Sequence, residues 1–134
     1  MTGITRALWR FWAQFEADGA PLTAYCTGAV PDGAELPYIT FTPAQANAMT
    51  TLPLVATLWV RHDGINTAPA QAMCTAWLDA VAKTIPYEGA RIDLEHGFLI
   101  LDRGSGDFLS VIVDEEDKAV MGARVGYEIR YYTT

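Results

Sequence analysis

The side chains best suited to holding a metal ion fall in two short segments of the chain. His62 is followed directly by Asp63, and Asp93, Glu95 and His96 lie close together further along. Imidazole nitrogens and carboxylate oxygens are common metal ligands. However, the sequence contains no H-x-x-x-H or C-x-x-C pattern, and both histidines are expected in solvated turns at strand ends. We therefore predict that the chain holds no metal and needs no cofactor.

Nucleophilic catalysis has equally weak support in the sequence. Ser105 and Ser110 are the only serines, and neither lies in a G-x-S-x-G motif or beside a residue that would act as a base. The segment Gly104-Ser105-Gly106 resembles a phosphate-binding loop only superficially, because it follows a predicted hairpin strand and lacks both a lysine and a helix N-terminus. We therefore predict no catalytic residues and no enzymatic activity.

A run of four acidic residues precedes the last predicted strand. A calcium loop would need regularly spaced oxygen ligands and a following helix, and this segment has neither. A solvated turn, a contact with a basic partner and a site for a divalent cation stay open as interpretations, the solvated turn being the simplest. The run consists of Asp114, Glu115, Glu116 and Asp117.

The two cysteines give no sign of a disulfide framework. Cys26 lies in a segment that is rich in glycine and proline, and Cys74 lies in a predicted helix. Sequence alone does not show whether they approach each other. A reduced protein is the default expectation, with Cys74 as an inert buried thiol.

Composition predicts a single ordered domain spanning residues 1–134. Hydrophobic residues make up 51% of the chain, which is enough for one proper core at this length. The formal net charge of -7 opposes binding to nucleic acid, since that affinity comes from clustered Lys and Arg. The basic residues are scattered, although an acidic protein is suited to lining a conduit through which DNA slides without sticking. We expect no specific nucleic-acid partner.

The sequence also lacks the signals of a membrane or secreted protein. No stretch approaches the roughly 18 to 20 apolar residues of a membrane span. Residues 1–6 lead into aromatic and acidic residues rather than a signal-type apolar core. We expect neither membrane insertion nor secretion.

Two amphipathic helices are expected. The first runs from Ile4 to about Asp18, with an apolar stripe that Trp9 flanks as either a buried side chain or an exposed aromatic residue awaiting a partner. The second begins near Asn66 or Thr67 and ends before Pro86. Its apolar face comprises Ala70, Met73, Cys74, Trp77, Leu78 and Val81.

The remaining segments alternate as strands and turns. Strands are predicted at 38–42, 54–62, 90–95, 98–103, 108–113 and 123–131, with loops at 20–37 and 43–53. Leu54, Ala56, Leu58 and Val60 form the predicted core face of the second strand. The turn His96-Gly97 would place Arg91 opposite Asp102 in a hairpin. The expected fold is α+β, an antiparallel sheet packed against two helices with a long arm and extended loops.

The arm from Val30 to Phe41, the helix from Ala68 to Lys83 and the acidic turn before a tyrosine-rich last strand together resemble the tail terminator (tail completion) proteins of long-tailed bacteriophages. The resemblance covers nearly the whole chain. It implies a structural virion protein, assembled in the host cytoplasm, that forms a ring, usually a homohexamer. The ring caps the tail tube, ends its elongation and offers a surface to the head connector, so its partners are the tail tube protein and the head-tail connector protein.

Candidate interface residues under this interpretation combine exposed aromatic residues and arginines with the acidic turn. The alternatives are a neck, head-closure or tube-like ring protein, or a small soluble domain that binds a ligand or acts as an enzyme. Trp59 and Tyr132 have a second interpretation as a further apolar layer within the monomer. The candidates are Trp9, Trp59, Arg61, Arg103, Asp114, Glu115, Glu116, Asp117, Arg130 and Tyr132.

Overall fold

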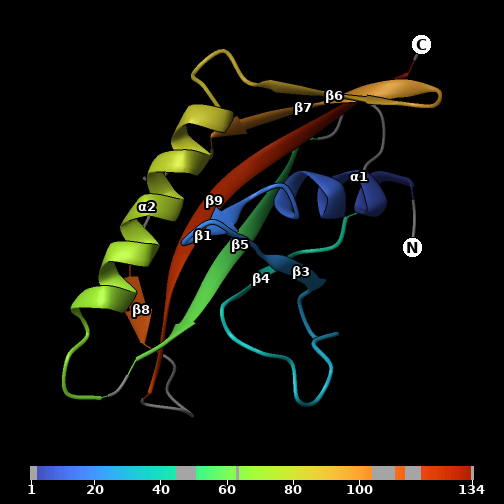
Figure 1. Ribbon diagram of the computed structural model, residues 1–134. Helices are drawn as coiled ribbons and strands as arrows, with labels where there is room; N and C mark the ends of the chain where they lie inside the picture. Colours follow the sequence, from blue (N-terminus) through green and yellow to red (C-terminus); the bar gives the residue numbers. More distant parts are fainter. Residues whose placement is uncertain (1–2, 45–50, 63, 104–110, 114–118, 134) are drawn as a thin grey trace.

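The computed structural model describes residues 3–44, 51–62, 64–103, 111–113 and 119–133, with only the backbone described for 111–113. These residues form an α+β fold, as predicted. Helices α1 (Gly3–Trp12) and α2 (Ala68–Thr84) pack on one side of a long twisted sheet (Figure 1). α2 lies along the middle of the sheet, and α1 crosses between its two edges.

Among the described residues, seven strands pair in the main sheet, and all but one of the pairings are antiparallel. The order is β3-β4-β5-β9-β7-β6, with β8 also paired to β9 and with β3 parallel to β4. The long strand β9 therefore joins the two halves of the sheet. The bounds are β3 Thr23–Cys26, β4 Tyr38–Phe41, β5 Thr51–Arg61, β6 Ala90–Leu94, β7 Gly97–Arg103, β8 Val111–Val113 and β9 Val120–Thr133.

The predicted core face of the sheet is confirmed. Successive side chains of a strand point to opposite faces, so every second residue turns toward the helices. On β5 the buried set is Leu54, Ala56, Leu58 and Val60, and on β9 it includes Ala123, Val125, Tyr127 and Ile129.

An aromatic cluster joins the two helices to this face. The Trp12 ring centre lies 6.0 Å from that of Trp77 on α2 and 5.2 Å from that of Tyr127 on β9. Phe11 and Phe15 complete the cluster with edge-to-face contacts. Buried aromatic rings supply large apolar contact areas, so this cluster fixes α1 and α2 over β9.

The prediction that the first helix reaches Asp18 is wrong, because the helix ends at Trp12. Asp18 and Gly19 have positive φ angles of 51° and 78°, which reverse the chain between the short strands β1 (Glu16–Ala17) and β2 (Ala20–Pro21). Aspartate and glycine tolerate this left-handed conformation, whereas a continuing helix does not.

The arm predicted at 20–37 is shorter than expected, since its first part forms β2 and β3. β3 pairs with β4 in parallel, and a parallel pair requires a crossover that no local hairpin signal announces. Residues 27–37, called the arm from here on, make that crossover. A turn closed by a 3.2 Å hydrogen bond from the Ala34 amide to the Pro31 carbonyl lies at its centre.

The second helix agrees closely with the prediction. Asn66 Oδ1 accepts a 3.1 Å hydrogen bond from the Ala68 amide at the helix start, and the helix ends at Thr84, two residues before Pro86. Ala70, Cys74, Trp77 and Val81 are buried against the sheet, with Met73 and Leu78 half-buried.

The predicted hairpin exists, but its register is wrong. Leu94 pairs with Gly97, so Glu95 and His96 form the turn, and Arg91 lies opposite Ile100 rather than Asp102. Gly97 is the first residue of β7, and the position requires glycine because a side chain there would overlap the Tyr132 carbonyl oxygen of β9. The predicted shared face of Ile92, Leu94, Leu99 and Leu101 survives, since the pairing changed by an even number of residues.

The other strands differ from the prediction mainly in length. β5 begins at Thr51, so the end of the predicted 43–53 loop is strand, while 45–50 lie outside the described residues. β9 extends the predicted 123–131 strand at both ends. Of the predicted 108–113 strand, 111–113 form β8 and the rest lies outside the described part. Among the described helices, none is long and apolar enough to span a membrane.

Candidate functional site

The sheet has one face that no described helix covers. Outward-pointing residues of β4, β5, β7 and β9 make up this surface, which we call the open face. It carries large side chains that remain accessible, including Val55 and Tyr132, which are 38% and 39% exposed. Four predicted interface residues lie on it, namely Trp59, Arg61, Arg130 and Tyr132.

One end of the open face holds an ordered cluster of aromatic and charged residues, the Arg130 cluster. Arg130 Nη2 lies 2.7 Å from Asp102 Oδ2, and this hydrogen bond and charge raise the pKa of Arg130. Phe98 and Tyr132 stack with ring centres 5.0 Å apart, and the Arg91 guanidinium lies 4.0 Å above the Phe98 ring. Stacked rings and guanidinium groups of this kind are typical of protein contact surfaces.

The other end holds the Trp59 cluster. Trp59 Nε1 donates a 3.0 Å hydrogen bond to Thr40 Oγ1, and the Tyr38 ring meets Tyr25 edge-on at 5.5 Å. A hollow of about 380 Å³ lies between these side chains and the arm, with Arg61 also in its lining.

The open face therefore brings the predicted residues onto one surface but not into one site. Arg130 pairs with Thr51, and Trp59 lies eight residues further along β5. This separation corresponds to roughly 27 Å at the usual rise of a strand. No described element lies over both clusters as a second apolar layer. The surface is suited to two separate contacts.

Two predicted interface residues lie elsewhere. Arg103 points to the helix side, where its Nε and Nη2 donate hydrogen bonds of 2.9 and 2.7 Å to the Ile85 and Ala82 carbonyls at the end of α2. Trp9 on α1 is 39% exposed, and its indole nitrogen donates a 3.0 Å hydrogen bond to the Ala24 carbonyl of the edge strand β3. Both side chains therefore make contacts within the chain.

The residues that suggested metal chemistry do not converge within the described part. His62 Nδ1 accepts a 2.9 Å hydrogen bond from the Gly64 amide, while His96 lies in the hairpin turn, 3.7 Å from Glu95. Among described residues, no three His, Cys, Asp or Glu side chains are placed to share a metal ion. Asp63 and the acidic run at 114–117 lie outside the described residues.

The cysteines are both free thiols. Cys74 is fully buried on α2, as predicted, and burial raises the pKa of its thiol. A raised pKa lowers the fraction of reactive thiolate at neutral pH. Cys26 is half-buried at the end of β3.

No family model, curated protein or solved structure matches this chain.

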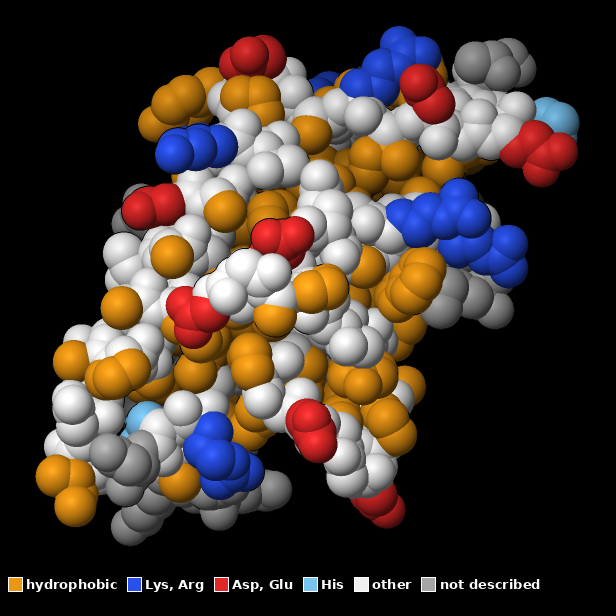
Figure 2. Space-filling view, viewed as in Figure 1, with side chains coloured by type: hydrophobic (Ala, Val, Ile, Leu, Met, Phe, Trp, Pro, Cys, Tyr) orange, Lys and Arg blue, Asp and Glu red, His pale blue; other side chains and the backbone are white. Residues whose placement is uncertain are grey.

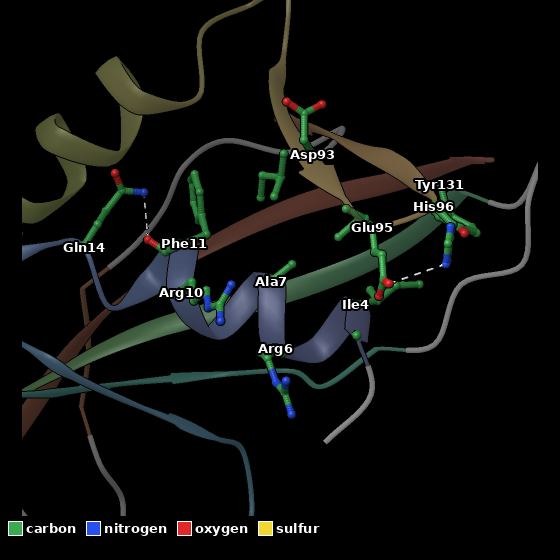
Figure 3. A pocket seen from close by; sticks show the side chains of 13 residues that line it. Ile4, Arg6, Ala7, Arg10, Phe11, Gln14, Asp93, Glu95, His96 and Tyr131 are labelled. Atoms are coloured by element: carbon green, nitrogen blue, oxygen red, sulfur yellow. Dashed lines mark hydrogen bonds and ion pairs between the residues drawn. The ribbon is translucent and has the colours of Figure 1, made fainter. Parts of the chain in front are cut away.

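Sequence reasoning missed one feature, a slot of about 740 Å³ between α1 and β6. Figure 2 shows apolar side chains exposed between the basic side chains over α1 and the strand hairpin beside it. Figure 3 shows Phe11 and Ala7 directed from α1 toward the hairpin, while the Arg6 side chain extends away from the hairpin. Arg6 and Arg10 are both among the residues that line the slot. The spacing of those two arginines, one helical turn apart, was the available sequence signal.

Proposed function

We propose that this protein is a structural virion component that forms a ring at the end of the tail tube of a long-tailed bacteriophage. The ring ends tube elongation and offers an attachment surface for the head connector. The resemblance of the Val30 to Phe41 segment and of the order of elements to tail terminator proteins supports this proposal.

The observation that carries the proposal is the open face with its two separated clusters. Aromatic residues and arginines are enriched among the residues that dominate binding energy at protein interfaces. A subunit between a tube and a connector needs two contact regions, and the Trp59 and Arg130 clusters lie roughly 27 Å apart. The function follows from association rather than from a reaction.

Ring closure places a further demand on each subunit. One surface must bind a different surface of the next copy, and the rotation from copy to copy must bring the last copy back to the first. The net charge of -7 suits a ring through which DNA passes, because it disfavours tight contact with phosphates. Six copies are the stoichiometry that the resemblance implies.

Light scattering and electron microscopy test this function directly. The purified protein is measured alone and after mixing with polymerised tail tubes, and we expect rings in solution and caps at tube tips. If the protein forms rings that bind the connector and do not bind tube tips, it would instead be a neck or head-closure protein. A monomer that binds neither would overturn the proposal.

A further inference from the structure

The slot between α1 and β6 has an apolar floor and an open side. Ile4, Ala7 and Phe11 line it from the helix, and Ile92 and Leu94 line it from β6. β6 is also the last strand of the main sheet, so within the described residues its outer edge has no partner strand. An edge next to an apolar slot is a favourable place for another chain to bind.

The charges at the rim of the slot favour an acidic occupant. Arg6 and Arg10 are exposed and form no ion pair with any residue in the described part of the chain. On the opposite wall, Asp93 already pairs with Arg91 at 2.8 Å. Glu95 lies beside His96. A neutral His96 leaves Glu95 unmatched, and the two guanidinium groups on α1 are also unmatched among the described residues, so the rim of the slot keeps a net positive charge.

The arm has the complementary properties. Asp32 and Glu35 are exposed, and neither forms an ion pair with a described residue. Ala29 and Pro31 are exposed and apolar beside them. Val30, by contrast, is half-buried and lines the hollow at the Trp59 cluster, so the acidic side of the arm faces outward. The arm is a compact turn with small apolar and acidic side chains.

The arm and the slot of one molecule lie apart. The arm joins β3 to β4 at one edge of the sheet, whereas β6 forms the other edge, with α1 between them (Figure 1). We propose that the slot receives the arm of a second copy, with Asp32 and Glu35 next to Arg6 and Arg10. This inference rests on the proposed ring, because a contact between two different surfaces continues from copy to copy until the ring closes.

Paired charge reversals test the contact. One double variant, Arg6→Glu with Arg10→Glu, reverses the slot, and the other, Asp32→Lys with Glu35→Lys, reverses the arm. Either variant alone brings like charges together at every contact, and we expect the concentration needed for ring formation to rise by at least about tenfold. A mixture of the two variants restores opposite charges at every contact. Rings should therefore return near the native concentration.

A third double variant serves as the matched control. Glu16→Lys with Glu88→Lys changes the net charge as much as the arm reversal does, at two exposed positions outside the arm. We expect native rings from this control. Thermal unfolding followed by circular dichroism should be near native in all variants, because every substituted side chain is exposed.

The outcomes separate this contact from the tail function. If the native protein forms rings that cap tubes and the charge-reversed variants also form rings, the contact between arm and slot is overturned, and the tail function is still supported. If mixing the two reversed variants restores rings but the native protein never caps tubes, the result supports the contact between arm and slot and not the tail function. If only the slot reversal prevents rings, another segment or ligand occupies the slot and the arm is the wrong occupant. A native chain that stays monomeric at every concentration would overturn the contact, and it would overturn the tail function as well if it binds neither tubes nor the connector.

Discussion

Tyr127 is an almost fully buried residue with a polar group, and it lies between the helices and the sheet. Its side chain is 1% exposed, and its hydroxyl accepts a 3.2 Å hydrogen bond from Trp12 Nε1. Burial raises the pKa of Tyr127, because a phenolate would lose its hydration there, although the hydrogen bond from Trp12 opposes this shift. The neutral phenol is therefore favoured by folding.

This raised pKa predicts a specific loss of stability in alkali. The unfolded chain ionises Tyr127 near pH 10, while the folded chain keeps it neutral. The stabilisation is fully present below about pH 10 and falls as the pH rises further. Urea unfolding measured from about two pH units below that pKa to about one unit above it should show this decline. Tyr127→Phe should reduce the slope of stability against pH.

The same variant should cost stability at neutral pH. Tyr127→Phe leaves the buried Trp12 N–H without its acceptor, and we expect a loss of about 1–3 kcal/mol in the free energy of unfolding. Tyr87 is 89% exposed, so Tyr87→Phe is the matched control and should leave both the stability and its pH dependence near native. Equal pH slopes for Tyr127→Phe and the native chain would contradict the assignment.

At the scale of single elements, the closing hairpin is fixed by a close approach of β7 to β9. A Cβ at Gly97 would overlap the Tyr132 carbonyl oxygen, and a Cβ at Gly126 would meet nothing within 4 Å. Both glycines lie in strands without a positive φ angle. Space, and not backbone conformation, distinguishes the two positions.

Alanine substitutions at these glycines should therefore differ sharply. Gly97→Ala forces β7 and β9 apart, and we expect it to destabilise the fold by about 1–3 kcal/mol or more. Gly126→Ala should change stability by less than about 1 kcal/mol, since alanine also loses less backbone entropy than glycine on folding. Chemical unfolding of the two variants gives the comparison. Similar stabilities would show that the sheet adapts to a side chain at 97.

The elements predicted correctly are those whose pattern extends over several turns or residues. The apolar spacing of α2 and the alternation along β5 and β9 were sufficient to place them. β1 and β2 were missed because strands of two residues show no alternation, although Asp18-Gly19 is a strong turn signal. The slot was missed because its walls come from segments far apart in the sequence.

The candidate interface was predictable only in part for the same reason. Alternation separated Trp59 and Tyr132 from the apolar sets of their own strands, and the structure places both on the open face. The distance between these two residues depends on the register of β5 against β9, and no local sequence pattern fixes that register. Arg103 was predicted to be an exposed interface residue because it is charged. Its side chain instead donates hydrogen bonds to carbonyls at the end of α2, and such tertiary contacts leave no local pattern in the sequence.

At the scale of the whole molecule, the separation of the two clusters makes their roles testable one at a time. Trp59→Ser and Tyr132→Ser remove the aromatic centre of each cluster. We expect one variant to lose tube capping and the other to lose connector binding, each by at least about tenfold, since central aromatic residues dominate interface energy.

Electron microscopy of tube tips and pull-down with the connector measure these two losses. Arg124→Ser is the control, because Arg124 is exposed on β9 between the two clusters. Thermal unfolding must first show that each variant is folded. Identical losses in the two aromatic variants would contradict separate contacts.

The position of β9 also orders events during synthesis. β4 and β5 pair with each other, as do β6 and β7, and within the described residues β9 is the strand that connects these two groups. A ribosome makes β9 after all the strands that it joins. Until then the nascent chain holds two unconnected pieces of sheet whose apolar faces lack a common core. We therefore expect chains interrupted before residue 120 to expose apolar surface and to be bound by chaperones or degraded by proteases.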